Sequence, residues 1–188
     1  MSVEVLQNPQ TAATHYDRGA VILHWLIAAC LVGQILFGWY LGEIPRGSPA
    51  RTIYVNFHKS TGILLGLLIL IRLGWRLGHP APALPSFMPL WERVWARWSH
   101  VGLYACMILM PLSGYVGSNF SKYGVNFMNA WKLPPWGVDD RSVYAFFNST
   151  HVMTSYVFVA LIVIHVAAAI RHAVHGDGVF SRMIVPRD

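Results

Sequence analysis

The chain has 188 residues, of which 55% are hydrophobic and 12% are charged, and its formal net charge is +6. A soluble domain carries about 25% charged residues. This composition, with a mean hydropathy of +0.44, excludes soluble, disordered and fibrous proteins and predicts an integral membrane protein. The basic residues flank long apolar runs, where they act as topology signals and contact lipid headgroups. We therefore expect a membrane lipid environment and no nucleic acid as a partner.

Four apolar runs are long enough to cross a bilayer, which takes about 20 residues. Three of them contain no charged side chain, and the second is interrupted only by Lys59. The third contains Pro111, which we expect to kink it. We predict an all-α fold, a bundle of four transmembrane helices in a single domain 1–188, with helices over about 19–42, 54–77, 97–118 and 147–174.

The connections between these runs differ in character. Residues 43–53 form a short loop, and residues 78–96 contain four prolines and then tryptophans, which indicates a linker followed by an interfacial segment. Residues 119–146 form the longest loop. Eight arginines lie on the side of the two termini and six basic residues on the other, which favours both termini inside the cell.

Histidines within the spans carry the functional argument, because ionisable residues inside a membrane are rare and mark functional sites. His58 and His151 lie near the starts of the second and fourth spans, on one side of the membrane, and His24 near the start of the first, on the other. His165 follows His151 by 14 residues, about 21 Å along a helix, which takes it to the depth of His24. Fourteen residues also return nearly to the same helix face. We therefore expect the pairs His58/His151 and His24/His165.

Two imidazoles at each of two depths suit bis-histidine ligation of b-type haem, which helix bundles hold in their cores. Such ligation leaves no open position for oxygen and favours electron transfer. The sequence has no C-x-x-C-H motif, which excludes covalent c-type attachment. A hydrogen-bonded contact between helices would explain any one of these histidines. A zinc or transition-metal site would explain several, although the spans contain no Asp or Glu to complete it.

Two further histidines lie at the inner ends of spans. His100, at the start of the third span, competes with His24 as the inner ligand. His100 and His172 are also candidates for contact with a quinone headgroup or a haem propionate.

Basic residues near the span ends are candidates for contact with haem propionates or quinone. The alternative for each is snorkelling to the membrane interface. The inner candidates are Arg18, Arg72 and Arg76, and the outer candidates are Lys59 and Arg51.

Several segments match a known family. The histidines lie in Val21-Ile-Leu-His24-Trp-Leu, in Phe57-His58-Lys-Ser-Thr-Gly-Ile63, and in the last span at Thr150-His151 and Ile164-His165. Further matching segments are Arg72-Leu-Gly-Trp-Arg76, Ser99-His100-Val-Gly-Leu-Tyr104, Pro111-Leu-Ser-Gly114 and Ser181-Arg182-Met183. With these segments the chain resembles the bacterial cytochrome b561 family of four-helix, di-haem membrane proteins over nearly its whole length.

The resemblance implies two haem b groups whose iron is bound by His24, His58, His151 and His165, in the pairs His24/His165 and His58/His151. It implies that His100 is not an axial ligand. It also implies the bacterial inner membrane as the location, with both termini cytoplasmic. A member of the family resembles a superoxide:ubiquinone oxidoreductase, which takes electrons from superoxide at the periplasmic face and reduces ubiquinone. We expect loop 119–146 to diverge most, so the outer donor stays open.

Three functions are therefore considered. The first is a stand-alone oxidoreductase that passes electrons from an outer donor, such as superoxide, to membrane ubiquinone. The outer loops carry a net charge of +3, which would concentrate a small anionic donor. The alternative is a haem-binding membrane subunit of a larger dehydrogenase or hydrogenase, which requires a redox partner protein. A non-redox metal carrier is the third reading.

Overall fold

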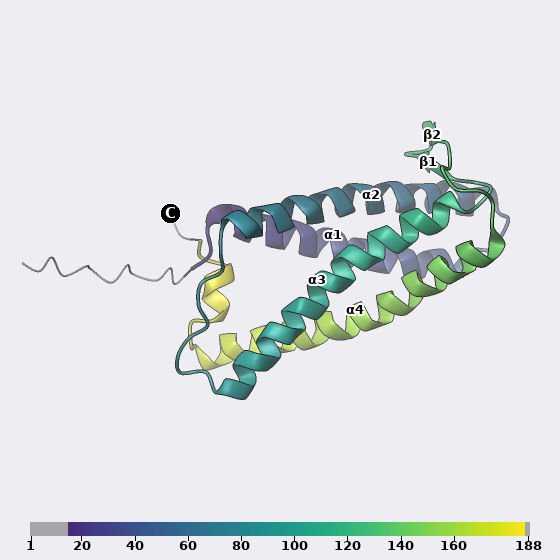
Figure 1. Cartoon of the computed structure of the whole chain (residues 1–188). Coiled ribbons are helices and arrows are strands. Elements are labelled where there is room, and N and C mark those ends of the chain that lie inside the picture. Colours follow the sequence, from purple (N-terminus) through teal and green to yellow (C-terminus); the bar gives the residue numbers. More distant parts are fainter. Residues whose placement is uncertain (1–14, 187–188) are drawn as a thin grey trace, which may run out of the picture.

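A computed structural model describes residues 15–186. Four long helices form an elongated bundle (Figure 1). They are α1 (Arg18–Glu43), α2 (Pro49–Gly78), α3 (Leu90–Asn119) and α4 (Arg141–His175). All four are long and apolar enough to cross a membrane. This confirms the predicted fold class.

Three of the helices begin at side-chain caps. Asp17 accepts a hydrogen bond from the amide of Ala20, Ser48 accepts from Arg51, and Asp140 accepts from Ser142 and Val143. A cap satisfies an amide that the first turn of a helix leaves without a partner. The caps explain why α2 begins at residue 49 and α4 at residue 141, earlier than the expected 54 and 147.

Helix α3 begins at Leu90, directly after Pro89, and not near residue 97. It therefore includes Trp91 and Trp95, which were expected in the linker and interfacial segment. No proline lies between residues 90 and 110, so nothing in the backbone prevents helix formation there. The helix also continues without interruption through Pro111.

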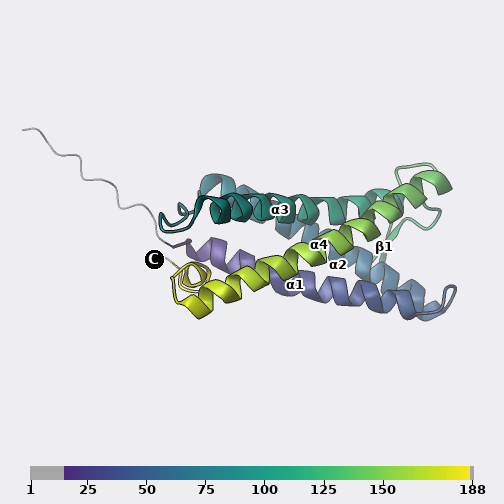
Figure 2. The same ribbon diagram turned by 90° about the horizontal axis from the view of Figure 1, so that it is seen from below.

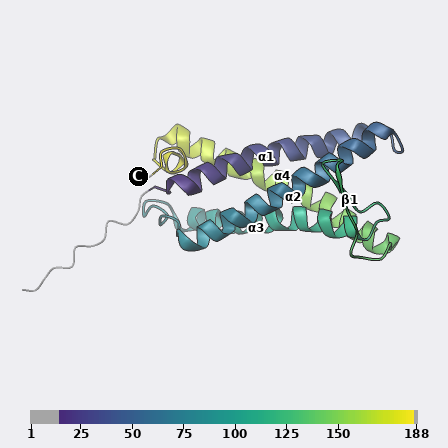
Figure 3. The same ribbon diagram turned by 90° about the horizontal axis from the view of Figure 1, so that it is seen from above.

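The helices pack in chain order, α1 on α2, α2 on α3 and α3 on α4 (Figures 2 and 3). Their shared core is a small cluster near the middle of the bundle. It consists of Ile27, Leu65, Ile69, Cys106, Met107 and Phe158. Many large apolar side chains point outward instead, such as Leu67 and Val163, which are 53% and 61% exposed. Such outward apolar faces are what a lipid environment requires.

A β-hairpin lies within the expected long loop, at the end of the bundle away from the termini (Figure 1). Strand β1 (Val125–Phe127) pairs antiparallel with β2 (Trp131–Leu133). Its turn is anchored to α2, because the amide of Met128 donates to the buried Ser60 hydroxyl at 2.7 Å and the Asn129 side chain bonds Asn56 at 2.9 Å. We refer to this end as the hairpin end.

The opposite end gathers the start of α1, the end of α2 and the C-terminal segment, and we refer to it as the terminal end. Gly176, with a φ of 64°, ends α4, and a short 3-10 helix follows at Phe180–Met183. The Trp25 indole donates to the carbonyl of Met183 at 2.7 Å, and Arg182 donates to the carbonyl of Ala83 at 2.9 Å. These bonds tie the C-terminal segment to α1 and to the loop after α2.

Gly66 permits the close approach of α2 to α3. A Cβ at Gly66 would lie 3.1 Å from the Pro111 side chain. Gly74 lies on the same helix, where a Cβ would meet nothing within 4 Å. We expect Gly66→Leu to destabilise the bundle by about 1–3 kcal/mol, the usual cost of overpacking. Gly74→Leu should leave the stability unchanged or raise it, because leucine favours helix over glycine.

The measurement is thermal unfolding of both variants in detergent, followed by tryptophan fluorescence. Equal melting temperatures for the two leucine variants would contradict the proposed packing role of Gly66.

Candidate functional site

Two pairs of histidines face one another inside the bundle. The ring centres of His24, on α1, and His165, on α4, lie 6.3 Å apart near the terminal end. The ring centres of His58, on α2, and His151, on α4, lie 6.2 Å apart near the hairpin end. Both pairs meet at steep interplanar angles, 66° and 87°. We call them the terminal pair and the hairpin pair.

Helix α4 supplies one histidine to each pair. Within residues 15–186, α4 packs closely on α3, whereas neither α1 nor α2 makes extensive backbone contact with α4. The histidine pairs therefore bridge helices that are otherwise held apart. This is the separation that a flat group between two opposed side chains would need.

Glycines lie directly against the rings of the hairpin pair. A Cβ at Gly38 would come within 3.3 Å of the His58 ring, and a Cβ at Gly114 within 3.2 Å of the His151 ring. Any larger residue at these positions would press on the imidazoles. The absence of a side chain at Gly38 and Gly114 therefore makes room for the rings of His58 and His151.

The hydrogen bonds of the hairpin pair define one ring orientation. The Nδ1 atom of His151 lies 2.9 Å from the carbonyl oxygen of Met110. A carbonyl only accepts, so this nitrogen carries the proton and Nε2 keeps a free lone pair. The Nδ1 atom of His58 is buried and has no hydrogen-bond partner among the described residues. A neutral imidazole whose Nε2 lone pair is free is the form that binds a metal.

The terminal pair has a cationic neighbour. The Nη2 atom of Arg72, on α2, lies 3.3 Å from the Nδ1 atom of His24, and its Nη1 donates to the carbonyl of Ala20 at 3.2 Å. His100, on α3, also approaches this pair, since its ring centre is 5.3 Å from that of His165. The structure thus brings three histidines and one guanidinium together at this end.

The remaining basic candidates lie in different surroundings. The Arg76 guanidinium is 5.6 Å from the centre of the Tyr16 ring, and its Nη1 is buried with no hydrogen-bond partner among the described residues. Arg18 is exposed at the first residue of α1. Lys59 points to the hairpin, where its ammonium donates to the carbonyl of Gly124 at 2.9 Å. Arg76 thus has a free buried donor, whereas Lys59 has a protein partner.

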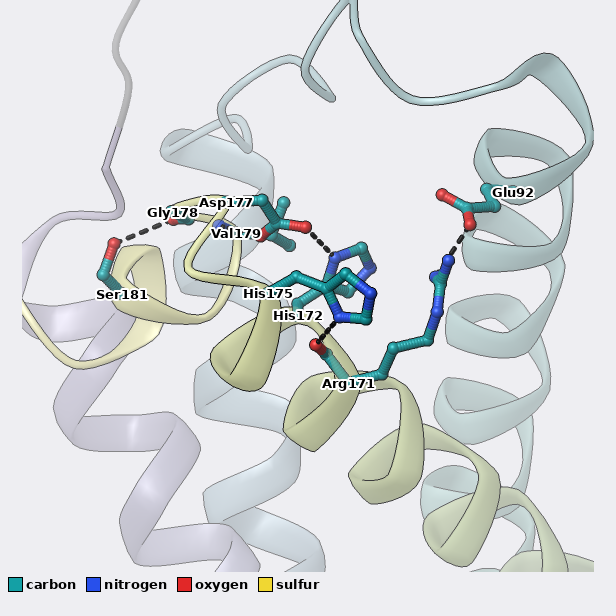
Figure 4. Close-up of polar contacts among 8 residues, drawn as sticks. All are labelled: Glu92, Arg171, His172, His175, Asp177, Gly178, Val179 and Ser181. Carbon is teal, nitrogen blue, oxygen red and sulfur yellow. Dashed lines mark hydrogen bonds and ion pairs between the residues drawn. The ribbon is translucent and has the colours of Figure 1, made fainter.

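His172 is held by a carboxylate that follows the end of α4. Its Nδ1 atom lies 2.5 Å from the carboxylate of Asp177, which also accepts from the amide of Val179 (Figure 4). Partial burial alone would raise the pKa of Asp177, but the bonds from His172 and Val179 outweigh it and keep the pKa below its ordinary value. Asp177 therefore stays ionised at neutral pH. Nearby, Arg171 forms an ion pair with Glu92 of α3 at 2.7 Å (Figure 4).

Several partners of the histidines were not identified from the sequence. These partners are the Met110 carbonyl, Ser113, Gln34 and Asp177. Two of them lie in or beside the segment Pro111-Leu-Ser-Gly114, which the sequence analysis had already singled out. Asp177 lies five residues after His172, beyond the glycine that ends α4, a spacing that helix periodicity does not link.

The donor set differs from that of a metal carrier. Within residues 15–186, no group of three or more His, Cys, Asp or Glu side chains is placed to hold a metal ion. Structural zinc takes four protein ligands and catalytic zinc three. Two opposed imidazoles are a donor set that could hold a haem iron between them.

Comparison with known proteins agrees with this geometry. Residues 15–186 match the family model described as prokaryotic cytochrome b561. The chain is also 28% identical over 163 residues to "Cytochrome b561 homolog 2" of Escherichia coli strain K12, an alignment that covers 86% of each chain. The chain therefore belongs to the prokaryotic cytochrome b561 family, whose members are membrane proteins that transfer electrons through b-type haem.

Proposed function

We propose that the chain holds two b-type haems and passes electrons through them from a donor at the hairpin end to ubiquinone in the membrane. His58 and His151 would bind the iron of one haem, and His24 and His165 that of the other. The observation that carries this proposal is the pair of opposed histidines at each end of the bundle, 6.2 Å and 6.3 Å between ring centres.

These separations fit one iron between each pair. A metal–imidazole bond is about 2 Å long and the ring centre lies about 1.1 Å beyond the bonded nitrogen, so two imidazoles on one metal have ring centres about 6 Å apart. The buried Nη1 of Arg76, which has no protein partner among the described residues, also fits a propionate carboxylate. When bound, haem supplies an iron that gains and loses one electron.

The protein's own residues then have defined tasks. Each histidine pair would hold one haem iron between two imidazoles, so the chemistry that haem would supply there is electron transfer. The Met110 carbonyl holds the His151 ring with its Nε2 lone pair free. Arg76 has a buried donor suited to a propionate carboxylate, and Arg18 and Arg72 lie at the same end. Lys59 would serve the outer haem only if it left the Gly124 carbonyl.

Ubiquinone would react at the terminal end. It takes up two electrons and two protons to become ubiquinol, so its site needs both a nearby haem and groups that exchange protons. His100, beside His165, and His172, bonded to Asp177, are the ionisable side chains placed for contact with its headgroup.

We assign the hairpin end to the periplasm and both termini to the cytoplasm of a bacterial inner membrane. The basic residues of the hairpin end exceed the acidic ones by a net charge of +3, which draws an anionic donor to that end. Superoxide fits this charge: each anion would give up one electron and leave as dioxygen, and two would reduce one ubiquinone.

The first test is the haem content of ligand variants. The purified protein should contain two b-type haems per chain, and His24→Ala and His58→Ala should each contain one. His165→Ala should lose the same haem as His24→Ala, because one iron needs both members of a pair. His175→Ala, an exposed histidine on α4 bonded to the carbonyl of Arg171, is the matched control and should retain both.

The measurement is the reduced-minus-oxidised spectrum together with haem extracted per chain. A wild-type protein without haem, or a His175→Ala variant that loses a haem as readily as His24→Ala, would refute the assignment of the ligands.

The second test concerns the charge of the donor. We expect superoxide, generated by pulse radiolysis, to reduce the haems at a rate that falls as salt is added, because salt screens the attraction to the hairpin end. Lys122→Gln combined with Lys132→Gln should slow the reaction about two- to tenfold, within the range of electrostatic steering. Arg93→Gln, an exposed arginine at the terminal end, should leave the rate unchanged.

A neutral reductant of similar size serves as the comparison and should show little dependence on salt or on the lysines. If the rate of reduction by superoxide depends neither on salt nor on the two lysines, the proposal of an anionic donor is wrong. Copurification of a second redox subunit, together with no reduction by small donors, would favour the alternative role as a subunit of a dehydrogenase or hydrogenase.

A further inference from the structure

The two histidine pairs have opposite neighbours at their outer ring nitrogens. In the hairpin pair, the Nδ1 of His151 lies 2.9 Å from the carbonyl oxygen of Met110, and the Ser113 hydroxyl is 3.4 Å away. In the terminal pair, the Nδ1 of His24 lies 3.3 Å from the Arg72 guanidinium. One ligand therefore faces a hydrogen-bond acceptor, and the other faces a full positive charge.

Resting on the two-haem function proposed above, we propose that Arg72 is a positioning residue that raises the reduction potential of the haem bound by His24 and His165. The potential of the terminal haem would then exceed that of the hairpin haem. Electrons would pass downhill from the hairpin end to the terminal end, where ubiquinone is reduced.

The charge of Arg72 is fixed and its position is constrained. A guanidinium stays protonated in proteins and can only donate hydrogen bonds. Its Nη1 is held by the Ala20 carbonyl, one turn before His24 on the same helix, at 3.2 Å. The side chain is only partly exposed. The bond to Ala20 therefore keeps Nη2 beside the ring of His24.

A positive charge at this distance favours the reduced iron. Reduction adds one negative charge to the site, and a nearby cation stabilises that charge more strongly in a partly buried position than in water. With iron bound through Nε2, the neutral His24 ring carries its proton on Nδ1, so Arg72 acts on the site as a nearby charge and not as a hydrogen-bond donor to the ring. This charge raises the potential.

The Met110 carbonyl has the opposite effect on the hairpin haem. An acceptor bonded to the Nδ1 proton makes the imidazole a stronger electron donor. A stronger donor stabilises the oxidised iron and lowers its potential. Lys59, the residue after His58, also brings a positive charge to this pair, but its ammonium is bound to the Gly124 carbonyl of the loop before β1, whereas Nη2 of Arg72 lies 3.3 Å from the His24 ring. The two ends thus differ in the direction that favours transfer toward the terminal end.

The experiment is a potentiometric titration of the intact purified protein and of Arg72→Gln. In the variant, the higher of the two reduction potentials should fall by about 59 mV. This fall corresponds to a change of about tenfold in the distribution of one electron between the haems. The lower step should stay in place. His151→Ala identifies which step belongs to the terminal haem, because it removes a ligand of the other.

Three further variants make the result specific. Arg72→Lys retains the charge and should keep most of the potential. Arg93→Gln removes one positive charge at the same end without contact to His24 in the structure, and should leave both steps unchanged. If Arg72→Gln does not yield folded protein, Arg72→Met removes the charge while keeping the apolar stem.

The outcomes separate the two proposals. A wild-type protein whose spectrum shows no haem would refute the two-haem function itself. Two haems whose potentials do not respond to Arg72→Gln would overturn only the role of Arg72. A rise of the upper step in that variant would also overturn it, because Arg72 would then stabilise a deprotonated, more strongly donating His24.

Discussion

The structure depends on one long helix that carries two histidines on a single face. Helix α4 has 35 residues, and the 14 residues between His151 and His165 correspond to about 21 Å and nearly four whole turns. One rigid element therefore reaches both ends of the bundle with the same orientation. The other members of the pairs come from α1 and α2, which make little backbone contact with α4. The contacts of α1 with α2, of α2 with α3 and of α3 with α4 hold the bundle together. The histidines face each other across the space that separates α4 from α1 and α2.

This constraint explains why the pairing follows from the sequence. Depth in a membrane is set by residue count from the start of a span, and the direction of a side chain is set by helix periodicity. Both are properties of the chain alone, so counting places His24 beside His165 and His58 beside His151, as the structure has them. The apolar runs predicted four helices for the same reason, since a bilayer demands a minimum length.

Other features depend on contacts that counting cannot supply. The hairpin at 125–133 has strands of three residues and is anchored by Ser60 and Asn56 of a distant helix. The early starts of α2 and α4 could have been predicted, because Ser48 before Pro49 and Asp140 are ordinary capping residues. The neighbours of the ring nitrogens could not, because Arg72 and the Met110 carbonyl reach His24 and His151 from other helices.

Arg72 and the Met110 carbonyl distinguish the two histidine pairs, which are otherwise made of the same type of side chain. A bundle with two identical histidine pairs has no inherent direction for electrons, since each site would hold its electron with the same affinity. Direction must come from the surroundings of the ligands, and in this chain the surroundings differ in charge. A guanidinium adjoins the pair at the terminal end, and a backbone carbonyl adjoins the pair at the hairpin end. Under the role proposed for Arg72, the end that gathers His100, His172 and Asp177 is also the end that would take up the electron.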